Sequence, residues 1–270
     1  MPDTESRNIN PLEGGRMLPT GEIARRLHDI VARKSEKRIV EDVRFGPSYV
    51  GVRLDNHNMG LAALLLHELP PGCSVFSEAG TLAGAGASII LKNLTEGRNP
   101  LEKALGLATA NAVLQPLICD DERDSLLIMN LTPDDHVAMV GLFSPMVPKI
   151  EATGAKLSII ERDPSRMVVL DNKDSDRILQ ECTLAIITAT TILNNTLEET
   201  LNSLGNPRHV AILGPSTPLC QEIFQDTPVT HLGGALVRDT DKVMQIISEG
   251  GGTRAMRPYL RFVNLLFVTP

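Results

Sequence analysis

The sequence predicts an α/β protein with a doubly wound parallel sheet in its C-terminal part and a smaller α+β unit in its N-terminal part. A short apolar run at 137–140 stops at Gly141, and a second one at 157–160 follows a helix-length segment that ends at Gly154. This pattern is typical of two buried parallel strands joined by a crossover helix. Strand-like and helix-like segments then alternate toward the C-terminus, whereas the N-terminal part shows no such alternation.

The N-terminal part is expected to contain a helix, two strands and a second helix. Thr20 is positioned to cap a helix whose apolar residues between 23 and 31 share one face. A Gly-Pro turn separates two β-type segments, which predicts strands at 39–43 and 49–54. The segment 60–69 has a helix-forming composition and stops before two prolines, so we expect a helix there.

A further helix is expected over 101–115. Asn99 would be its N-cap, Pro100 would occupy the first helical position, and Glu102 would reach back to the cap. Asn111 lies in the apolar part of this helix and needs a hydrogen-bond partner if it is buried. A ligand and a contact between domains would each supply that partner.

The acidic, polar run at 120–124 is the best candidate for a linker between domains. It divides the chain into an α+β domain over 1–118 and an α/β domain over 119–270. Further strands are expected in the second domain at 184–187, 209–213, 229–232 and 259–268. Helices are expected at 174–181, after Asn195 with Glu198 completing a capping box, after Thr217 with Pro218 in the first position, and at 239–248.

The composition excludes two classes of partner. There are 26 basic and 33 acidic residues, a net charge of −7, and only 3% aromatic residues, so neither a basic surface nor a base-stacking platform for nucleic acid is expected. No apolar stretch is long enough to span a membrane, and the polar N-terminus lacks the apolar core of a signal peptide. We therefore expect a cytoplasmic protein that binds neither nucleic acid nor membrane.

Cysteines and histidines do not show the spacings of a metal site encoded in local sequence. The four cysteines lie far apart without a C-x-x-C pair, and the six histidines form no pair three or four residues apart. We expect the cysteines to be reduced, packed thiols.

Candidate binding residues follow the predicted strands, because ligands of doubly wound sheets bind beyond the carboxyl ends of the strands. Small residues let backbone N–H groups approach a ligand, and hydroxyl groups can donate hydrogen bonds to it. The residues of this kind are Gly141, Thr188, Thr190, Thr191, Gly214, Ser216, Thr217, Gly250, Gly251, Gly252, Thr253 and Arg254.

Several of these residues have two interpretations. The glycines at 250–252 can turn successive N–H groups toward an anion, with Arg254 adding a planar guanidinium, or Gly250 can simply end the preceding helix. Thr217 can begin a helix that points at a ligand or merely cap it. The threonines at 188–191 can bind a ligand or favour the end of a strand.

Glu161 and Glu78 are the candidate catalytic carboxylates. Glu161 lies 20 residues after Gly141, where nucleotide-binding sheets place a ribose-binding carboxylate, although the loop after Gly141 is not G-x-G-x-x-G. It could equally be a solvated strand end. Glu78 opens a glycine-rich segment at 78–86 that could face a cleft or allow close helix packing.

Five motifs in order resemble a prokaryotic family of heavy-metal chelation domain proteins; they lie at 40–47, 78–84, 99–112, 214–219 and 247–254. The resemblance implies an enolase N-terminal-like domain followed by a Rossmann-like domain, with the active site between them. It also implies a divalent metal ion as the cofactor. The positions that match its motifs are Glu78, Asn99, Asn111, Gly214, Ser216, Gly250, Gly251, Gly252, Thr253 and Arg254.

Three functions follow as hypotheses. The first is a metal-handling protein that holds a metal chelate or small anionic molecule between its domains, with Arg254 binding the anion and Glu78 and Glu161 acting as ligands or acid–base groups. The second is a nucleotide- or S-adenosylmethionine-dependent transferase in which Glu161 binds the ribose. The third is a non-catalytic interaction protein, and self-association into a homo-oligomer is left open.

Overall fold

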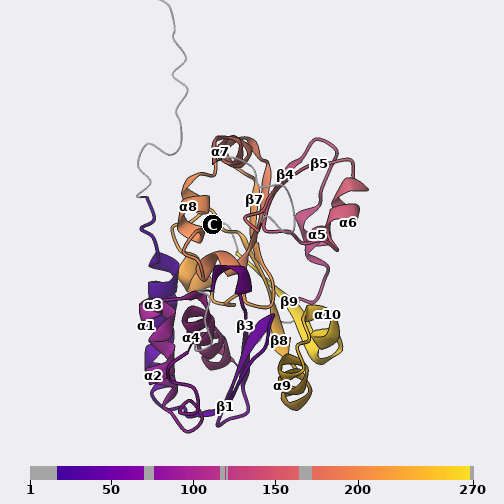
Figure 1. Cartoon of the computed structure of the whole chain (residues 1–270). Helices are drawn as coiled ribbons and strands as arrows, with labels where there is room; N and C mark the ends of the chain where they lie inside the picture. Colours follow the sequence, from indigo (N-terminus) through magenta and orange to yellow (C-terminus); the bar gives the residue numbers. More distant parts are fainter. Residues whose placement is uncertain (1–16, 70–75, 116–118, 120, 164–171, 268–270) are drawn as a thin grey trace, which may run out of the picture.

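The computed structural model describes residues 17–69, 76–115, 119, 121–163 and 172–267. A three-stranded sheet belongs to the N-terminal part and a six-stranded sheet to the C-terminal part. Figure 1 shows the N-terminal elements, in indigo to magenta, below the larger sheet. The predicted α/β class with a mostly parallel larger sheet is confirmed. Within the described residues, none of the helices combines the length and apolarity needed to cross a membrane.

The three-stranded sheet is antiparallel and packs between helices on both faces. Its strands, in spatial order, are β1 (Val40–Phe45), β2 (Tyr49–Leu54) and β3 (Met59–Ala63). Helix α4 (Pro100–Leu114) covers one face, and α9 (Thr240–Ser248), from the C-terminal part, covers the other. Alternate residues of the strands therefore enter two different apolar clusters, one on each face.

The helix predicted over 60–69 is wrong, because this segment forms β3 and the short 3₁₀ helix η1 (Leu66–Glu68). β3 pairs with β2 along its whole length, and a Cβ atom on Gly60 would lie only 2.0 Å from the carbonyl oxygen of Ala108 in α4. The bare glycine thus lets the strand press against the helix. Strand pairing and this close contact outweigh a helix-forming composition.

Helix α1 (Glu22–Ser35) begins two residues after Thr20, the predicted cap. Gly21 is the N-cap in a left-handed conformation, so the capping role predicted for Thr20 is wrong. Instead, the buried carboxylate of Glu198, in the C-terminal part, accepts a hydrogen bond of 2.9 Å from the N–H of Ile23. The charge that satisfies this helix terminus therefore comes from a distant part of the chain.

The predicted start of α4 is confirmed. The side chain of Asn99 accepts hydrogen bonds of 3.0 Å from the N–H groups of Leu101 and Glu102. The carboxylate of Glu102 reaches back and accepts from Arg98 N at 2.7 Å. Two short helices, α2 (Ala87–Leu91) and α3 (Asn93–Glu96), precede α4 and pack against it.

The six-stranded sheet contains five parallel strands and one antiparallel strand at its edge. In spatial order the strands are β5 (Lys156–Ile160), β4 (His136–Val140), β6 (Leu184–Thr188), β7 (His209–Leu213), β8 (His231–Val237) and β9 (Leu260–Leu266). The chain winds from β4 to β5 in one direction and from β6 onward in the other. The switch between β4 and β6 is the position at which such sheets bind ligands.

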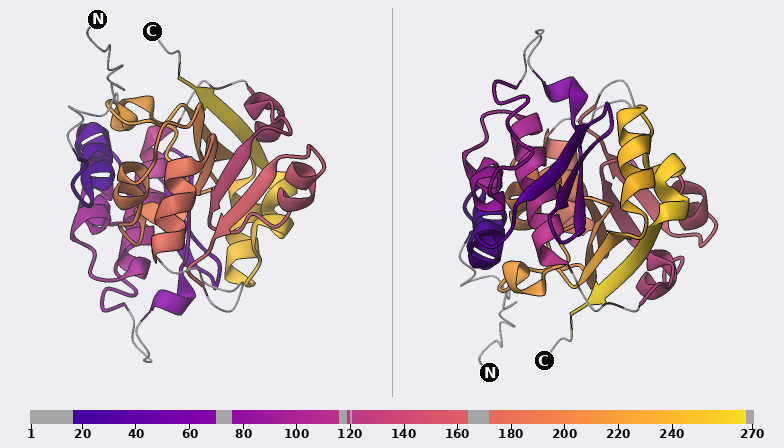
Figure 2. Two further views of the ribbon diagram at one scale, coloured as in Figure 1. Left: turned by 90° about the horizontal axis from the view of Figure 1, so that it is seen from above. Right: turned by 90° about the horizontal axis from the view of Figure 1, so that it is seen from below.

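Helices cover both faces of this sheet, as Figure 2 shows. On one face lie α5 (Ser125–Met129) and α6 (Val147–Glu151), which contribute to the apolar cluster around β4 and β6. On the other face lie α7 (Asn172–Glu181), α8 (Leu197–Asn202) and the N-terminal helices, which share one continuous apolar cluster with the sheet. The division predicted between residues 118 and 119 stays a prediction.

Two predicted helix starts in the C-terminal part are wrong. Asn195 lies one residue before the N-cap, in a left-handed conformation with φ +57°, and α8 begins after Thr196 instead. Thr217 starts no α-helix, because the buried segment that follows it stays irregular as far as the 3₁₀ helix η3 (Gln221–Phe224). The remaining short elements are η2 (Ala189–Ile192), α10 (Thr253–Met256) and η4 (Arg257–Tyr259).

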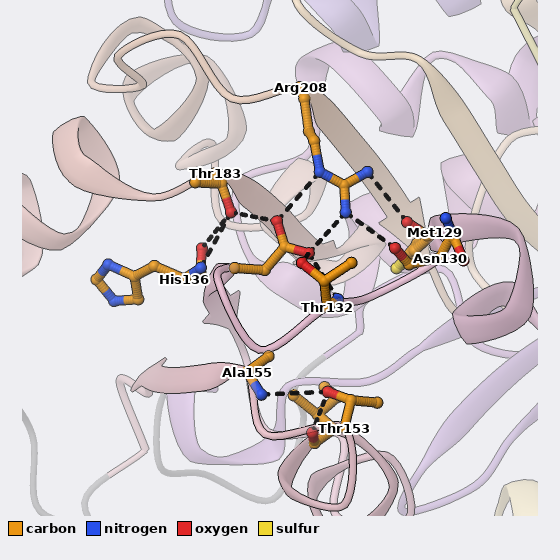
Figure 3. Close-up of polar contacts among 10 residues, drawn as sticks. Met129, Asn130, Thr132, His136, Thr153, Ala155, Thr183 and Arg208 are labelled. Carbon is orange, nitrogen blue, oxygen red and sulfur yellow. Dashed lines mark hydrogen bonds and ion pairs between the residues drawn. The ribbon is translucent and has the colours of Figure 1, made fainter.

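At the amino edge of the large sheet, the buried carboxylate of Asp135 ties three segments together. Arg208 donates to both of its oxygens, from Nε at 3.1 Å and from Nη2 at 2.7 Å (Figure 3). Thr183 Oγ1 and Thr132 N each donate to it at 2.8 Å. The Arg208 guanidinium, with these added donors, holds the pKa of Asp135 far below its ordinary value.

Candidate functional site

A cleft of about 1500 Å³ lies at the carboxyl ends of the parallel strands. We call it the strand-end cleft. It is larger than the roughly 300 to 1000 Å³ typical of small-molecule sites, so a ligand and its surrounding water both fit. The strand ends that line it are 140–146, 160–163, 188–191 and 213–216. Gly233 and Gly234, within β8, also line it, and the N-terminal part contributes 47–49 and 63–68.

The cleft brings together nine of the predicted site residues. They are Gly141, Glu161, Thr188, Thr190, Thr191, Gly214, Ser216, Gly252 and Thr253. The others are not among its lining residues; these are Glu78, Asn99, Asn111, Thr217, Gly250, Gly251 and Arg254. Glu78 and Arg254 are exposed, and Asn99 is used as the cap of α4.

Glu161 organises the loop that follows β4. One carboxylate oxygen accepts from Leu142 N at 3.0 Å, and the other accepts from Arg162 N at 2.8 Å and Asp163 N at 3.1 Å. Gly141, between β4 and this loop, adopts φ +82°, and a Cβ atom there would lie 2.5 Å from Thr188 Cγ2 across the switch point. The buried carboxylate therefore fixes the backbone on one side of the switch, and its predicted role toward a ribose stays a prediction.

The threonines after β6 form the other side of the switch point. The hydroxyls of Thr188 and Thr190 lie 3.1 Å apart, and the hydroxyl of Thr191 donates to the carbonyl of Thr188 at 2.7 Å. Thr191 is thus committed to closing its own turn. Thr188 and Thr190 line the cleft as a hydroxyl pair that can exchange hydrogen bonds with a ligand.

The glycine-rich loop ends α9, which is the second of its two predicted roles. Gly250 adopts φ +84°; its N–H donates to Ile247 O at 3.1 Å, and that of Gly251 donates to Ile246 O at 2.8 Å. This is the Schellman arrangement of a helix C-terminus. The N–H groups of Gly250 and Gly251 are therefore occupied by the helix, and Gly252 is the glycine of the three that lines the cleft.

Asn111 joins the two parts of the chain. Its side-chain nitrogen donates to Leu61 O of β3 at 2.9 Å and to Ser216 O at 3.0 Å. The hydroxyl of Ser216 in turn accepts from Ala63 N at 2.8 Å. The loop after β7, which lines the cleft, is thus fastened to the N-terminal sheet through the contact between domains that the sequence left open.

A polar group that sequence reasoning missed faces the strand ends from η1. Glu68 accepts from the side-chain amide of Asn194 at 3.0 Å, and His67 lies 3.6 Å from Glu68 and 3.9 Å from the carboxylate of Asp163. All four residues line the cleft. The available signal was an adjacent histidine and glutamate in an otherwise apolar segment, which the incorrect helix prediction obscured.

Opposite charges meet in the cleft, and the acidic ones are more numerous. Seven lining residues carry a carboxylate and four are lysine or arginine. Lys149 lies 2.6 Å from Asp124 and lowers the pKa of that carboxyl group. Arg257 stacks over the ring of Phe262 at 5.1 Å from its centre. The net charge favours a cation or a metal complex over a free anion.

The cysteines in the described part of the chain are buried, and the thiols of Cys182 and Cys220 stay protonated at neutral pH. Burial raises the pKa of Cys182 to about 11 and that of Cys220 to about 12. The donor atoms that the cleft offers are therefore imidazole nitrogen and oxygen. Among the described residues, His, Cys, Asp and Glu form no group of three or more that could hold a metal ion.

A hydrogen-bond chain runs from the cleft wall to the amino edge of the sheet through the buried residues Asn264 and His231. Asn264 and Ser125 line the cleft; Asn264 Oδ1 accepts from Ser125 Oγ at 2.7 Å and lies 2.9 Å from His231 Nε2. Since the Asn264 amide nitrogen donates to two backbone carbonyls, its oxygen is the acceptor, and His231 carries its proton on Nε2. His231 Nδ1 then accepts from His209 Nε2 at 3.2 Å.

Lowering the pH is expected to destabilise the folded protein through His209, the last residue of this hydrogen-bond chain. Burial, with smaller effects from the nearby His231 and from the Arg208 guanidinium, lowers the pKa of His209 from 6.5 to about 4. Between these values the unfolded chain binds the proton and the folded chain does not, so the free energy of unfolding falls as the pH falls, by about 1 to 2 kcal/mol because His209 is partly exposed. Urea denaturation of wild type and His209→Gln across this range tests it; equal slopes with pH would contradict it.

Comparison with known proteins identifies relatives along most of the chain. Two family models match, both described as "Putative heavy-metal chelation": DUF4213 over residues 28–114 and DUF364 over residues 124–266. A protein of Methanocaldococcus jannaschii printed as "Uncharacterized protein MJ0500" is 26% identical over 235 residues, which cover 83% of this chain and 88% of the relative.

Two crystal structures share the fold. A DUF364-family protein of unknown function from Pyrococcus horikoshii superposes with a TM-score of 0.78 at 21% identity, covering 91% of this chain and 100% of that one. Another, from Desulfitobacterium hafniense, gives a TM-score of 0.74 at 22% identity, covering 90% of this chain and 98% of its own. At this identity the likeness shows the fold alone. With a family model matched over more than half of its residues, the chain belongs to the DUF364 family.

Proposed function

We propose that the protein binds a divalent transition-metal ion carried by a small organic chelator, in the strand-end cleft. The observation that supports this most directly is the meeting of His67 and Glu68, from η1, with Asp163, from the end of β5. The imidazole lies between the two carboxylates, with Nε2 toward Glu68 and Nδ1 toward Asp163, so a metal ion there would need further ligands from elsewhere. The family description, "Putative heavy-metal chelation", points to the same chemistry.

The kinds of donor atom in the cleft select the metal. Imidazole nitrogen and carboxylate oxygen suit zinc, nickel, copper and iron, whereas soft ions that need thiolates would find the described cysteines buried and outside the cleft lining. Glu68 already accepts a hydrogen bond from Asn194, and the backbone N–H of Asp163 donates one to the Glu161 carboxylate. We therefore place most of the metal's ligands on the chelator, with His67 completing them.

The chelator would be bound by groups of the strand ends. The hydroxyls of Thr188 and Thr190 can exchange hydrogen bonds with its oxygens. Arg257 lines the cleft and can pair with a carboxylate of the chelator. The metal ion offsets the charge of the chelator's own carboxylates, so the complex brings less negative charge to the acidic lining than the free chelator would.

Substituting His67 is expected to weaken binding of nickel nitrilotriacetate about 10-fold or more, because the complex leaves coordination positions on nickel that an imidazole fills. Isothermal titration calorimetry with nickel nitrilotriacetate, and with nickel chloride alone, measures this for wild type and His67→Gln. His57→Gln is the matched control, since that imidazole is 80% exposed and does not line the cleft. No binding by wild type, or equal affinity in both variants, would contradict the proposal.

Substituting Arg257 and Arg254 in turn distinguishes an anion-binding site in the cleft from one at the glycine-rich motif. Arg257 lines the cleft and Arg254 is exposed outside its lining, although the glycine-rich motif favours Arg254. We expect Arg257→Ala to weaken nickel nitrilotriacetate several-fold and Arg254→Ala to leave the affinity unchanged, measured by the same titration. A larger loss of affinity in Arg254→Ala than in Arg257→Ala would place the anion site at the glycine-rich motif.

Nucleotide or S-adenosylmethionine binding is the second candidate, because Glu161 lines the cleft at the end of the second strand in chain order. A thermal-shift series with nucleotides and S-adenosylmethionine separates it from metal-chelate binding. Stabilisation of about 2.7 kcal/mol at a hundredfold excess over the dissociation constant, lost in Glu161→Gln, would favour it. Catalytic roles for Glu161 and Glu78 stay predictions.

A further inference from the structure

A second, much smaller cavity lies at the joint between the two parts of the chain. It has a volume of about 20 Å³, and its lining includes Asn111 and Gln115 at the end of α4, Thr217, and Ala235 of β8. One water molecule needs roughly 10 to 15 Å³ of such volume and two to four polar partners. The cavity therefore has room for one water molecule.

Two buried polar atoms belong to residues that line this cavity. Asn111 is 9% exposed and Thr217 is 3% exposed. The amide nitrogen of Asn111 is fixed by its bonds to Leu61 O and Ser216 O, so the identity of its oxygen is settled. That oxygen and the hydroxyl of Thr217 have no hydrogen-bond partner among the described residues. Leaving such atoms unsatisfied would be costly.

We infer that a single bound water molecule fills this cavity and bridges Asn111 Oδ1 to Thr217 Oγ1. The water donates one hydrogen bond to the amide oxygen, which can only accept. It forms its second hydrogen bond with the hydroxyl, which can donate or accept. Gln115 is the third polar residue in the lining. The water completes the joint that holds the 214–217 loop, so it helps to fix one wall of the strand-end cleft.

The sign of one substitution tests this inference. With the bridging water, Thr217→Val removes one of its partners and is expected to lower the melting temperature by about 2 to 4 °C. Without it, Thr217→Val would replace an unsatisfied hydroxyl by a methyl group and leave the melting temperature unchanged or higher, which would overturn the inference. Thr109→Val is the matched control, because its buried hydroxyl donates to Leu105 O and it lines neither cavity.

A high-resolution crystal structure of the full chain supplies the direct measurement. We expect a peak of electron density within hydrogen-bond distance of both Asn111 Oδ1 and Thr217 Oγ1. A cavity without density, or side chains rearranged so that both atoms find protein partners, would overturn the inference. Either result is independent of whether the strand-end cleft binds a metal chelate.

Discussion

Replacing Asp135 with asparagine is expected to lower the free energy of unfolding by about 2 to 4 kcal/mol. The Asp135 residue is 5% exposed, and its carboxylate accepts from Arg208, Thr132 and Thr183. Asparagine would keep one acceptor oxygen, but it would remove the negative charge that pairs with Arg208 and place an NH2 donor against the donors of the other oxygen. The estimate is below that for a fully buried pair because the Arg208 side chain is 45% exposed. Chemical denaturation of wild type and variant measures the difference.

Asp134→Asn is the matched control, because the neighbouring Asp134 is exposed, and it should change the stability by less than about 0.5 kcal/mol. The Asp135 carboxyl has a lowered pKa, so its stabilising contribution is complete above its ordinary value of 3.8 and is lost as the pH falls below it. Equal stabilities of the Asp135→Asn and Asp134→Asn variants would show that Asp135 does not hold the edge of the sheet together.

Adding a methyl group at Gly60 is expected to be at least as damaging. The Cβ atom of alanine would lie 2.0 Å from Ala108 O and 2.3 Å from Ala112 N. Both are backbone atoms of α4, so no side-chain rotation can relieve the contact, and the loss should be about 3 kcal/mol or more. Circular dichroism during thermal and urea unfolding of Gly60→Ala measures the loss.

Gly86 offers a control for this glycine substitution. It has φ −64°, and a Cβ atom there would be 3.8 Å from its nearest neighbour. Gly86→Ala should therefore stay within about 0.5 kcal/mol of wild type. A Gly60→Ala protein as stable as Gly86→Ala would contradict the close packing of β3 on α4.

The elements that could be predicted from sequence are those determined locally. The apolar runs on either side of Gly141 gave β4 and β5 correctly, and Asn99 with Glu102 marked the start of α4, because each signal lies within a few residues of the structure it specifies. β7 was predicted with its bounds unchanged at His209–Leu213. Buried parallel strands are short, continuous and apolar, so little else competes for such a segment.

The errors occurred where distant residues decide the local structure. Glu198 supplies the charge at the start of α1, and α4 together with β2 turns the segment after Met59 into a strand. Neither partner lies near the segment it controls, so composition and capping signals pointed elsewhere. Propensity is a weak guide where pairing and packing are this extensive.

In the candidate site, too, the residues that follow from local sequence could be predicted and those that depend on distant contacts could not. Residues such as Gly141 and Thr188 could be predicted because the ends of parallel strands meet at one edge of the sheet. His67 and Glu68 could not, since Glu68 contacts Asn194, 126 positions further along the chain. Their position depends on how the N-terminal part sits on the large sheet, which no local pattern specifies.

Anomalous X-ray diffraction from crystals of the full chain grown with nickel nitrilotriacetate would test metal-chelate binding in the strand-end cleft most directly. We expect a nickel peak inside the cleft beside His67, with density for the chelator extending toward the ends of β4 and β6. Nickel bound only outside the cleft at saturating concentration, with the strand ends free of chelator, would contradict the proposed function.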